Sequence, residues 1–149
     1  MRIRMGRIFV IAILAEILAN LALVVIVALF GPADPAAAQA YAESTGFWVG
    51  PLAGFAFTLI GGWWIARSLA NSQVLNGFAL GVAVALIDIS ILVMSGAEFL
   101  PVFVYSNVGR IFAGSLGGWL AGRVTQRANE PSAAPSAGQS QQTDSPGAN

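Results

Sequence analysis

The stretch IFVIAILAEILANLALVVIVALF, residues 8–30, decides the fold class of this chain. Glu16 is the only charged residue in it. As an α-helix, a segment of this length rises about 34 Å, enough to cross a bilayer core of about 30 Å. Apolar and polar residues do not alternate as they do in membrane β-strands, and a bilayer core requires backbone polar groups to be satisfied within the segment. The stretch therefore predicts a transmembrane α-helix.

Three more apolar segments of similar length follow, at residues 47–66, 74–94 and 99–121. The chain of 149 residues is 56% hydrophobic and 9% charged, with a mean hydropathy of +0.73. A soluble domain carries about 25% charged residues, so this composition excludes that class. We predict an all-α integral membrane protein, a four-helix bundle made of two tandem helical hairpins.

The arginines give the expected orientation of the bundle. All seven basic residues are arginines, and six of them flank the predicted helices on one side: Arg2, Arg4, Arg7, Arg67, Arg123 and Arg127. The connections after the first and third segments contain neither arginine nor lysine. Because cytoplasmic loops are enriched in basic residues, we expect both termini in the cytoplasm and the protein in the cytoplasmic (inner) membrane.

The connection between the first two segments carries helix signals of its own. Asp34 is a favourable N-cap, Pro35 a favourable first residue and Gly46 a favourable stop, so residues 35–44 are expected to form a short helix on the outer surface. The Ala-Gln-Ala sequence at 38–40 also fits a signal-peptide cleavage site. The preceding apolar stretch is longer than that of a signal peptide, which favours the surface helix.

The chain divides after residue 127. Residues 1–127 hold the predicted helices, whereas residues 128–149 are mainly Ala, Pro, Ser, Gln and Gly, with no apolar side chain larger than alanine. Such a segment buries too little apolar surface to offset the entropy lost on ordering. We predict a four-helix transmembrane domain followed by a disordered cytoplasmic tail.

The second and fourth segments end in matching motifs. Residues 61–67, GGWWIAR, match residues 117–123, GGWLAGR, at both glycines, the first tryptophan and the arginine. One explanation is the duplication of a two-helix unit. The other is an interfacial anchor used twice, with tryptophan at the level of the headgroups and arginine just inside it.

Three ionisable residues lie within the predicted spans: Glu16, Asp88 and Arg110. Facing lipid, each would cost about 2.5–3.5 kcal/mol, so we expect them to face the bundle interior. Stripes of small residues support this, because such stripes mark helix contacts in membranes. The predicted helix-packing glycines are Gly54, Gly62, Gly77, Gly81, Gly114, Gly118 and Gly122.

Depth along the helices predicts which charges meet. At 1.5 Å per residue from the cytoplasmic ends, Asp88 lies ~22 Å deep and Arg110 ~20 Å deep, whereas Glu16 lies ~13 Å deep. We predict an ion pair between Asp88 and Arg110, with either a structural or a functional role. Because arginine keeps its proton, we expect Asp88→Asn, which strands Arg110, to be more damaging than Arg110→Gln.

Glu16 has no basic partner at its own level other than through the long Arg110 side chain, and Asn20 lies one turn above it. Desolvation of an unpaired carboxylate favours its protonated form, which a proton-coupled carrier uses. Two structural explanations stay open: a protonated Glu16 that hydrogen-bonds Asn20, and a side chain that reaches the inner headgroups. The candidate intramembrane polar site consists of Glu16, Asn20, Asp88 and Arg110.

The composition also excludes several chemistries. The chain has no cysteine, histidine or lysine, so thiolate, imidazole, zinc and P-loop chemistry are absent. The loops hold no convergent acid–base set, so we expect no catalytic residues, no cofactor and no metal site. Without a basic patch, we expect no nucleic-acid partner.

Two classes of function remain compatible with the sequence. The first in rank is a non-enzymatic membrane module that assembles through its glycine-rich helix faces, as a homo-oligomer or with another membrane protein. The alternative is a small proton- or ion-coupled transporter or channel subunit that uses Glu16, Asp88 and Arg110. Both have the lipid bilayer as a partner.

Overall fold

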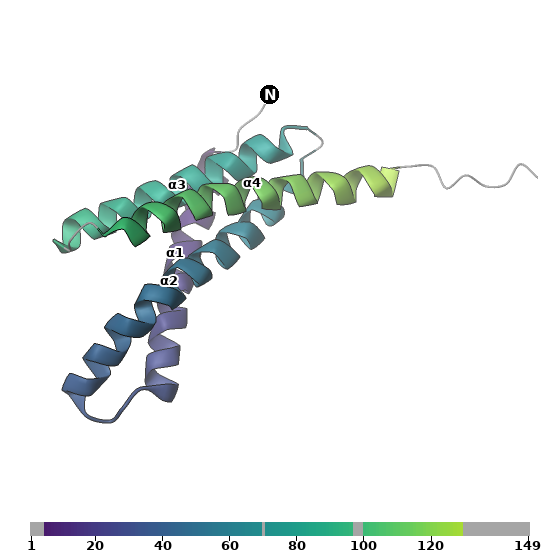
Figure 1. Ribbon diagram of the computed structural model, residues 1–149. Helices are drawn as coiled ribbons and strands as arrows, with labels where there is room; N and C mark the ends of the chain where they lie inside the picture. Colours follow the sequence, from purple (N-terminus) through teal and green to yellow (C-terminus); the bar gives the residue numbers. More distant parts are fainter. Residues whose placement is uncertain (1–4, 70, 97–99, 130–149) are drawn as a thin grey trace, which may run out of the picture.

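The computed structural model describes residues 5–69, 71–96 and 100–129. In these ranges the chain forms four α-helices, α1 (Met5–Phe30), α2 (Pro35–Ala66), α3 (Gln73–Ser95) and α4 (Pro101–Asn129) (Figure 1). The predicted all-α, four-helix fold is confirmed. Of the predicted tail, residues 128 and 129 belong to α4, and the rest lies outside the described residues.

Among the described residues, α1, α2 and α3 are long and apolar enough to cross a membrane. The chain is therefore a small, multi-pass helical membrane protein. The fourth predicted span, 99–121, falls largely in α4, which has 29 residues but is not among these candidate spans. Polar residues such as Ser106 and Asn107, together with Arg110 and several glycines, dilute the apolar content of α4.

The start of α2 is as predicted, and its predicted interruption is wrong. Asp34 caps the helix, because its Oδ2 accepts a hydrogen bond of 2.8 Å from the Ala37 backbone nitrogen. The helix then runs through Gly46 without a break. A glycine inside a helix costs only about 1 kcal/mol relative to alanine, and this one lies against α1, where an added Cβ would be 3.3 Å from Leu23 Cδ2. Residues 35–44 therefore extend α2 rather than forming a separate surface helix.

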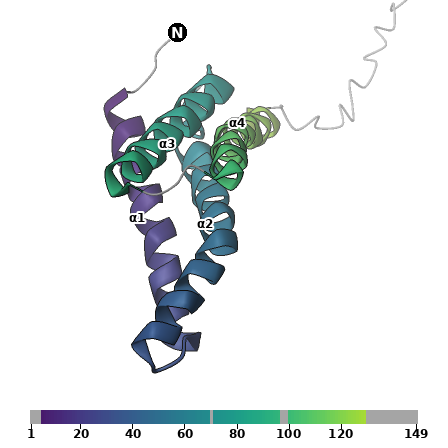
Figure 2. The ribbon, with the colours of Figure 1, turned by 60° about the vertical axis from the view of Figure 1, so that its left-hand side comes forward.

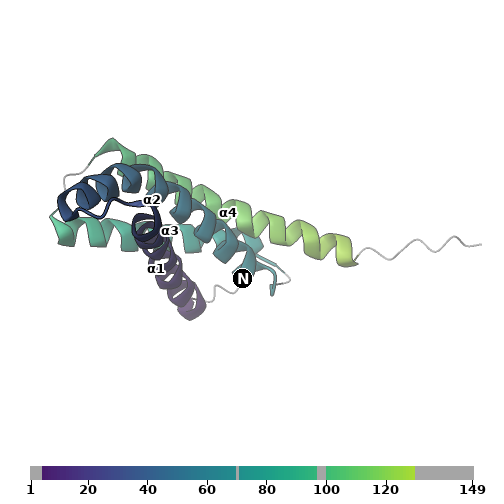
Figure 3. The same cartoon turned by 90° about the horizontal axis from the view of Figure 1, so that it is seen from below.

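The helices pack as two sets that diverge at one end. α4 lies beside α2 and α3, while α1 lies against α2 and α3 (Figure 3). Figures 1 and 2 show that α1 crosses α3 rather than running parallel to it. In the same two views, the α1–α2 connection points away from the end where α3 meets α4. The α1–α2 connection therefore lies apart from α3 and α4 at this end.

The opposite end of the bundle is closed by an apolar core. Its side chains come from the first half of α1, the end of α2, the α2–α3 connection and the first half of α3, namely Ile8, Ala12, Ala15, Ile65, Leu69, Leu80 and Val84. Further exposed apolar side chains cover the outside of the helices, as expected of surfaces in contact with lipid.

Glycines bring α4 into backbone contact with its neighbours. A Cβ added at Gly62 would lie 2.6 Å from the Gly114 carbonyl oxygen, and one at Gly81 would lie 2.6 Å from Ile111 Cα. A Cβ at Gly117 would lie 2.7 Å from the Trp63 backbone nitrogen, so the two matching motifs pack against each other. All seven predicted helix-packing glycines face atoms of another helix of this chain.

Candidate functional site

A cluster of three charged side chains lies in the interior of the bundle. One nitrogen of Arg110 on α4, Nη1, lies 2.7 Å from Glu16 Oε1 on α1 and 2.8 Å from Asp88 Oδ1 on α3. Arg110 and Glu16 are each 4% exposed, whereas the Asp88 side chain is 21% exposed. One guanidinium nitrogen thus joins three helices, and we call Glu16, Asp88 and Arg110 the charge cluster.

Asn107 is a member of the site that the sequence analysis missed. Its Nδ2 donates a hydrogen bond of 2.9 Å to Asp88 Oδ2 and one of 2.8 Å to the Phe103 carbonyl oxygen. The amide thus holds the carboxylate oxygen that is not bound to Arg110. Asn107 lies one turn before Arg110 on α4, and its polarity within an apolar helix was the signal that could have identified it.

The α2 face opposite Arg110 is shaped to admit the guanidinium group. A Cβ added at Gly54 would lie 2.6 Å from Arg110 Nε and 2.7 Å from its Nη2. Thr58, one turn later on α2, is fully buried. Its Oγ1 and Arg110 Nε are both buried without a hydrogen-bond partner among the described residues. Gly54 is therefore the position at which α2 makes room for the cluster.

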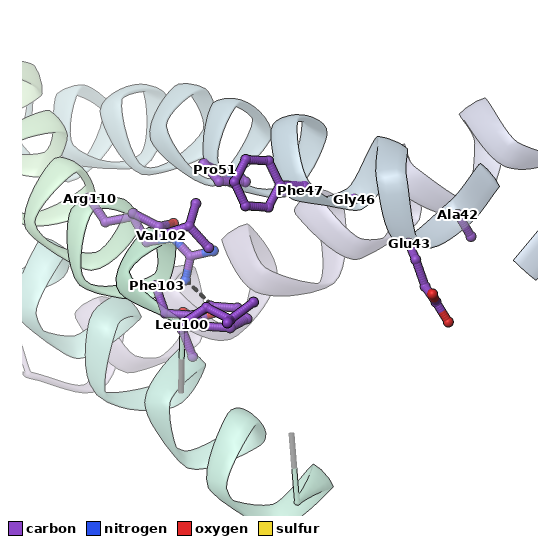
Figure 4. A pocket seen from close by; sticks show the side chains of 12 residues that line it. Ala42, Glu43, Gly46, Phe47, Pro51, Leu100, Val102, Phe103 and Arg110 are labelled. Carbon is purple, nitrogen blue, oxygen red and sulfur yellow. Dashed lines mark ion pairs between the residues drawn. The ribbon is translucent and has the colours of Figure 1, made fainter. Parts of the chain in front are cut away.

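A cavity of about 310 Å³ leads to the cluster between α2 and α4, and we call it the α2–α4 cavity. Asp88 and Arg110 both line it, and Figure 4 shows Arg110, with its ion pair, facing the space below Pro51 and Phe47. Glu43 lies at the far side, with its side chain directed away from Arg110 (Figure 4). The remaining lining is mostly apolar: Ala42, Gly46, Gly50, Leu100, Val102, Phe103 and Ser106.

A second cavity reaches the cluster from another direction. It has a volume of about 430 Å³, lies between α1 and α3, and is lined by Glu16 and Asn20 among apolar residues. Asp88 and Arg110 do not line it, and Glu16 does not line the α2–α4 cavity. Several side chains that line this second cavity, including Ile17, Val24 and Ile91, are exposed, so it is an open apolar groove on the outer surface of α1 and α3.

The structure brings together three of the four residues of the predicted polar site. Asp88 and Arg110 are in contact, as the depth estimate predicted. Glu16 also contacts Arg110, the basic partner that the sequence left open to it through the long arginine side chain, and this contact is the shorter of the two. Asn20 does not hold the Glu16 carboxyl group; its Nδ2 donates to the Glu16 backbone carbonyl oxygen at 2.9 Å. Glu16 is buried and does not reach the headgroups.

The charge cluster contains two carboxyl groups and one guanidinium group. Ionised together, they carry one more negative than positive charge, and the bilayer core makes an uncompensated charge costly. Within the part of the chain that the structure describes, no three His, Cys, Asp or Glu side chains are placed to bind a metal ion. No protein-family model, curated protein or solved structure matches this chain.

Proposed function

We propose that this chain is a small, non-enzymatic membrane protein that binds and transfers a proton or a small cation at its charge cluster. In this proposal all four helices cross the cytoplasmic membrane as two hairpins, with both termini in the cytoplasm. α4 is the least apolar helix, but it packs along α2 and α3, and its Asn107 and Arg110 bind carboxylates of the neighbouring helices.

The observation that carries the proposal is the pairing of two carboxyl groups with a single guanidinium nitrogen. A proton or a monovalent cation would balance the remaining negative charge. Removing it would change the forces on Arg110, because either carboxylate can then compete for the same Nη1. Asp88 lines the α2–α4 cavity, so an ion could reach the charge cluster from that side.

The other candidate function, assembly through glycine-rich faces, has less support. The glycines on which it rests pack α2, α3 and α4 against each other within one chain. Among the glycines of α2, Gly50 alone has no other atom within 4 Å of its added Cβ. We therefore rank ion coupling above assembly and propose that any homo-oligomer or partner complex uses the exposed apolar faces instead.

Ion flux in liposomes that contain only this protein tests the proposal. A pH-sensitive dye inside the liposomes reports proton entry when a potassium gradient with valinomycin sets the membrane potential. We expect flux from the wild-type protein and none above protein-free liposomes from Glu16→Gln or Asp88→Asn. Parallel samples with inward gradients of Na⁺ or K⁺ identify which cation moves.

Glu43→Gln is the matched control, because it removes a carboxylate next to the same cavity but outside the charge cluster. We expect this variant to retain wild-type flux. Circular dichroism and gel filtration of each variant establish that the loss of flux is not a loss of fold. No flux of any tested cation by the folded wild-type protein would overturn the proposal, as would full flux in both cluster variants.

A further inference from the structure

A hydrogen bond joins α1 to the α2–α3 connection at the end of the bundle that holds the apolar core. Arg7, in the first turn of α1, donates a hydrogen bond of 3.4 Å from Nη1 to Ser68 Oγ. Ser68 directly follows Arg67, the last residue of the motif that ends α2. The Ser68 hydroxyl itself donates to the Ile65 carbonyl oxygen at 3.2 Å. Arg7 and Arg67 are exposed, so their remaining hydrogen-bond donors are available to a ligand.

The tryptophans of α2 fix the position of Arg67. Its guanidinium carbon lies 5.1 Å from the centroid of the Trp63 ring and 5.6 Å from that of Trp64. Contacts of this kind leave the in-plane N–H donors of an arginine free, because the guanidinium group is held through the ring face. Arg67 is thus positioned without its donors being used by a carboxylate.

No described carboxylate neutralises this group. Among residues 5–69, 71–96 and 100–129, Arg7 and Arg67 form no ion pair. The described acidic residues lie elsewhere: Glu16 and Asp88 belong to the charge cluster, and Asp34 and Glu43 lie near the start of α2. The pair is therefore a local positive charge at a membrane-facing end of the bundle.

An apolar groove begins beside the same arginine. It measures about 340 Å³ and is lined by Gly6, Arg7, Val10 and Ile11 of α1. Gly6 has no atom within 4 Å of an added Cβ, so nothing else in the described structure fills this surface. Positive charge next to an apolar groove matches the two parts of a phospholipid, a phosphate group and an acyl chain.

We propose that Arg7 and Arg67 form a binding site for the phosphate of an anionic phospholipid, with one acyl chain along the α1 groove. Arginine recognises phosphate oxygens with paired hydrogen bonds, and Ser68 positions Arg7 by accepting a hydrogen bond from its Nη1. The site joins α1 to the α2–α3 connection, so the bound lipid would brace these elements against each other. It is independent of the proposed ion coupling.

Lipid binding to the purified protein in a neutral detergent tests this site. Phosphatidylglycerol and phosphatidylcholine of the same chain length are titrated, and bound lipid is counted by native mass spectrometry. We expect tighter binding of phosphatidylglycerol to the wild-type protein. Arg7→Gln and Arg67→Gln each remove a charge-assisted hydrogen bond, so we expect each to weaken that binding by about tenfold or more.

Arg123→Gln is the matched control. Arg123 stacks on Trp119 at 4.0 Å and ends the equivalent motif of α4, but no hydroxyl or second arginine is paired with it among the described residues. We expect this variant to weaken binding by about fivefold at most, the general effect of one charge near an anionic lipid. Equal losses in all three variants would overturn a specific site, as would equal binding of the two lipids.

The groove is tested separately from the charges. Gly6→Ile fills it while leaving both arginines in place, so it should weaken lipid binding without changing the unfolding temperature of the lipid-free protein. Inorganic phosphate is titrated as a ligand that has no acyl chain. If it competes with phosphatidylglycerol at equal concentration, or if Gly6→Ile binds lipid as the wild type does, the site recognises phosphate alone and the lipid proposal is wrong.

Discussion

Arg110 has two carboxylate partners on one nitrogen, and this changes which substitutions should be damaging. Asp88→Asn leaves Arg110 paired with Glu16, and Glu16→Gln leaves it paired with Asp88. We therefore expect each single change to cost about 1–2 kcal/mol, close to the loss of one charged hydrogen bond. Arg110→Gln deprives both carboxylates at once and should be the most damaging single change, which reverses the order that the sequence predicted.

The double variant Glu16→Gln/Asp88→Asn provides the decisive measurement. It leaves the buried guanidinium group without any carboxylate, so its loss should exceed the sum of the two single losses by at least about 1 kcal/mol. Unfolding free energies of the four proteins in detergent give this coupling. If the loss of the double variant equals the sum of the two single losses, neither carboxylate substitutes for the other as a partner of Arg110.

Gly54 is the residue that fits α2 to the guanidinium group. Gly54→Ala would bring a methyl group to 2.6 Å from Arg110 Nε, so either α2 or the arginine must move. We expect a loss of about 1–3 kcal/mol in unfolding free energy, the usual range for overpacking. Gly50→Ala is the control, because its Cβ meets nothing within 4 Å, and it should be neutral or stabilising by up to about 1 kcal/mol. Equal effects of Gly54→Ala and Gly50→Ala on the unfolding free energy would mean that α2 shifts to accommodate the added methyl group.

At the scale of the elements, α4 depends on close backbone approach. A Cβ at Gly114 would contact the Gly77 carbonyl oxygen and lie 2.9 Å from the Gly81 backbone nitrogen, so it would separate α4 from α3. At Gly109 of the same helix, the nearest atom is Phe55 Cδ2 at 3.8 Å. We expect Gly114→Ala to lower the thermal unfolding midpoint in detergent and Gly109→Ala to leave it nearly unchanged.

Deletion of residues 130–149 completes this comparison. The sequence predicts a disordered tail there, so its removal should leave the midpoint of the wild-type protein unchanged. A larger effect of the deletion than of Gly114→Ala would show that the tail contributes to the fold.

At the scale of the whole molecule, the absence of cysteine makes the orientation directly testable. We expect an impermeant maleimide to label Ala37→Cys in intact cells and to label Gln126→Cys only after the membrane is opened. Both positions are exposed, one near the start of α2 and the other near the end of α4, so access is limited by the membrane rather than by packing. Labelling of Gln126→Cys in intact cells would overturn the cytoplasmic placement of the C-terminus.

The sequence by itself determined the fold class and the character of the helices. In a bilayer, a long apolar segment must satisfy its backbone hydrogen-bonding groups within itself. Because this requirement is local, composition and segment length are enough to predict four helices. The Asp34 cap was predictable for the same reason, since it depends only on neighbouring residues. The burial of Glu16 and Arg110 also followed from the cost of placing charges in lipid.

The tertiary structure alone decided which polar groups meet. Depth counted along straight, parallel helices placed Glu16 about 7 Å from the level of Arg110. Because α1 crosses α3 and the arginine side chain is long, two residues 94 positions apart nevertheless share an ion pair. The role of Asn107 and the continuation of α2 through Gly46 were likewise set by neighbouring helices. Helix crossing and rotation depend on packing between distant segments, and no local pattern in the sequence encodes them.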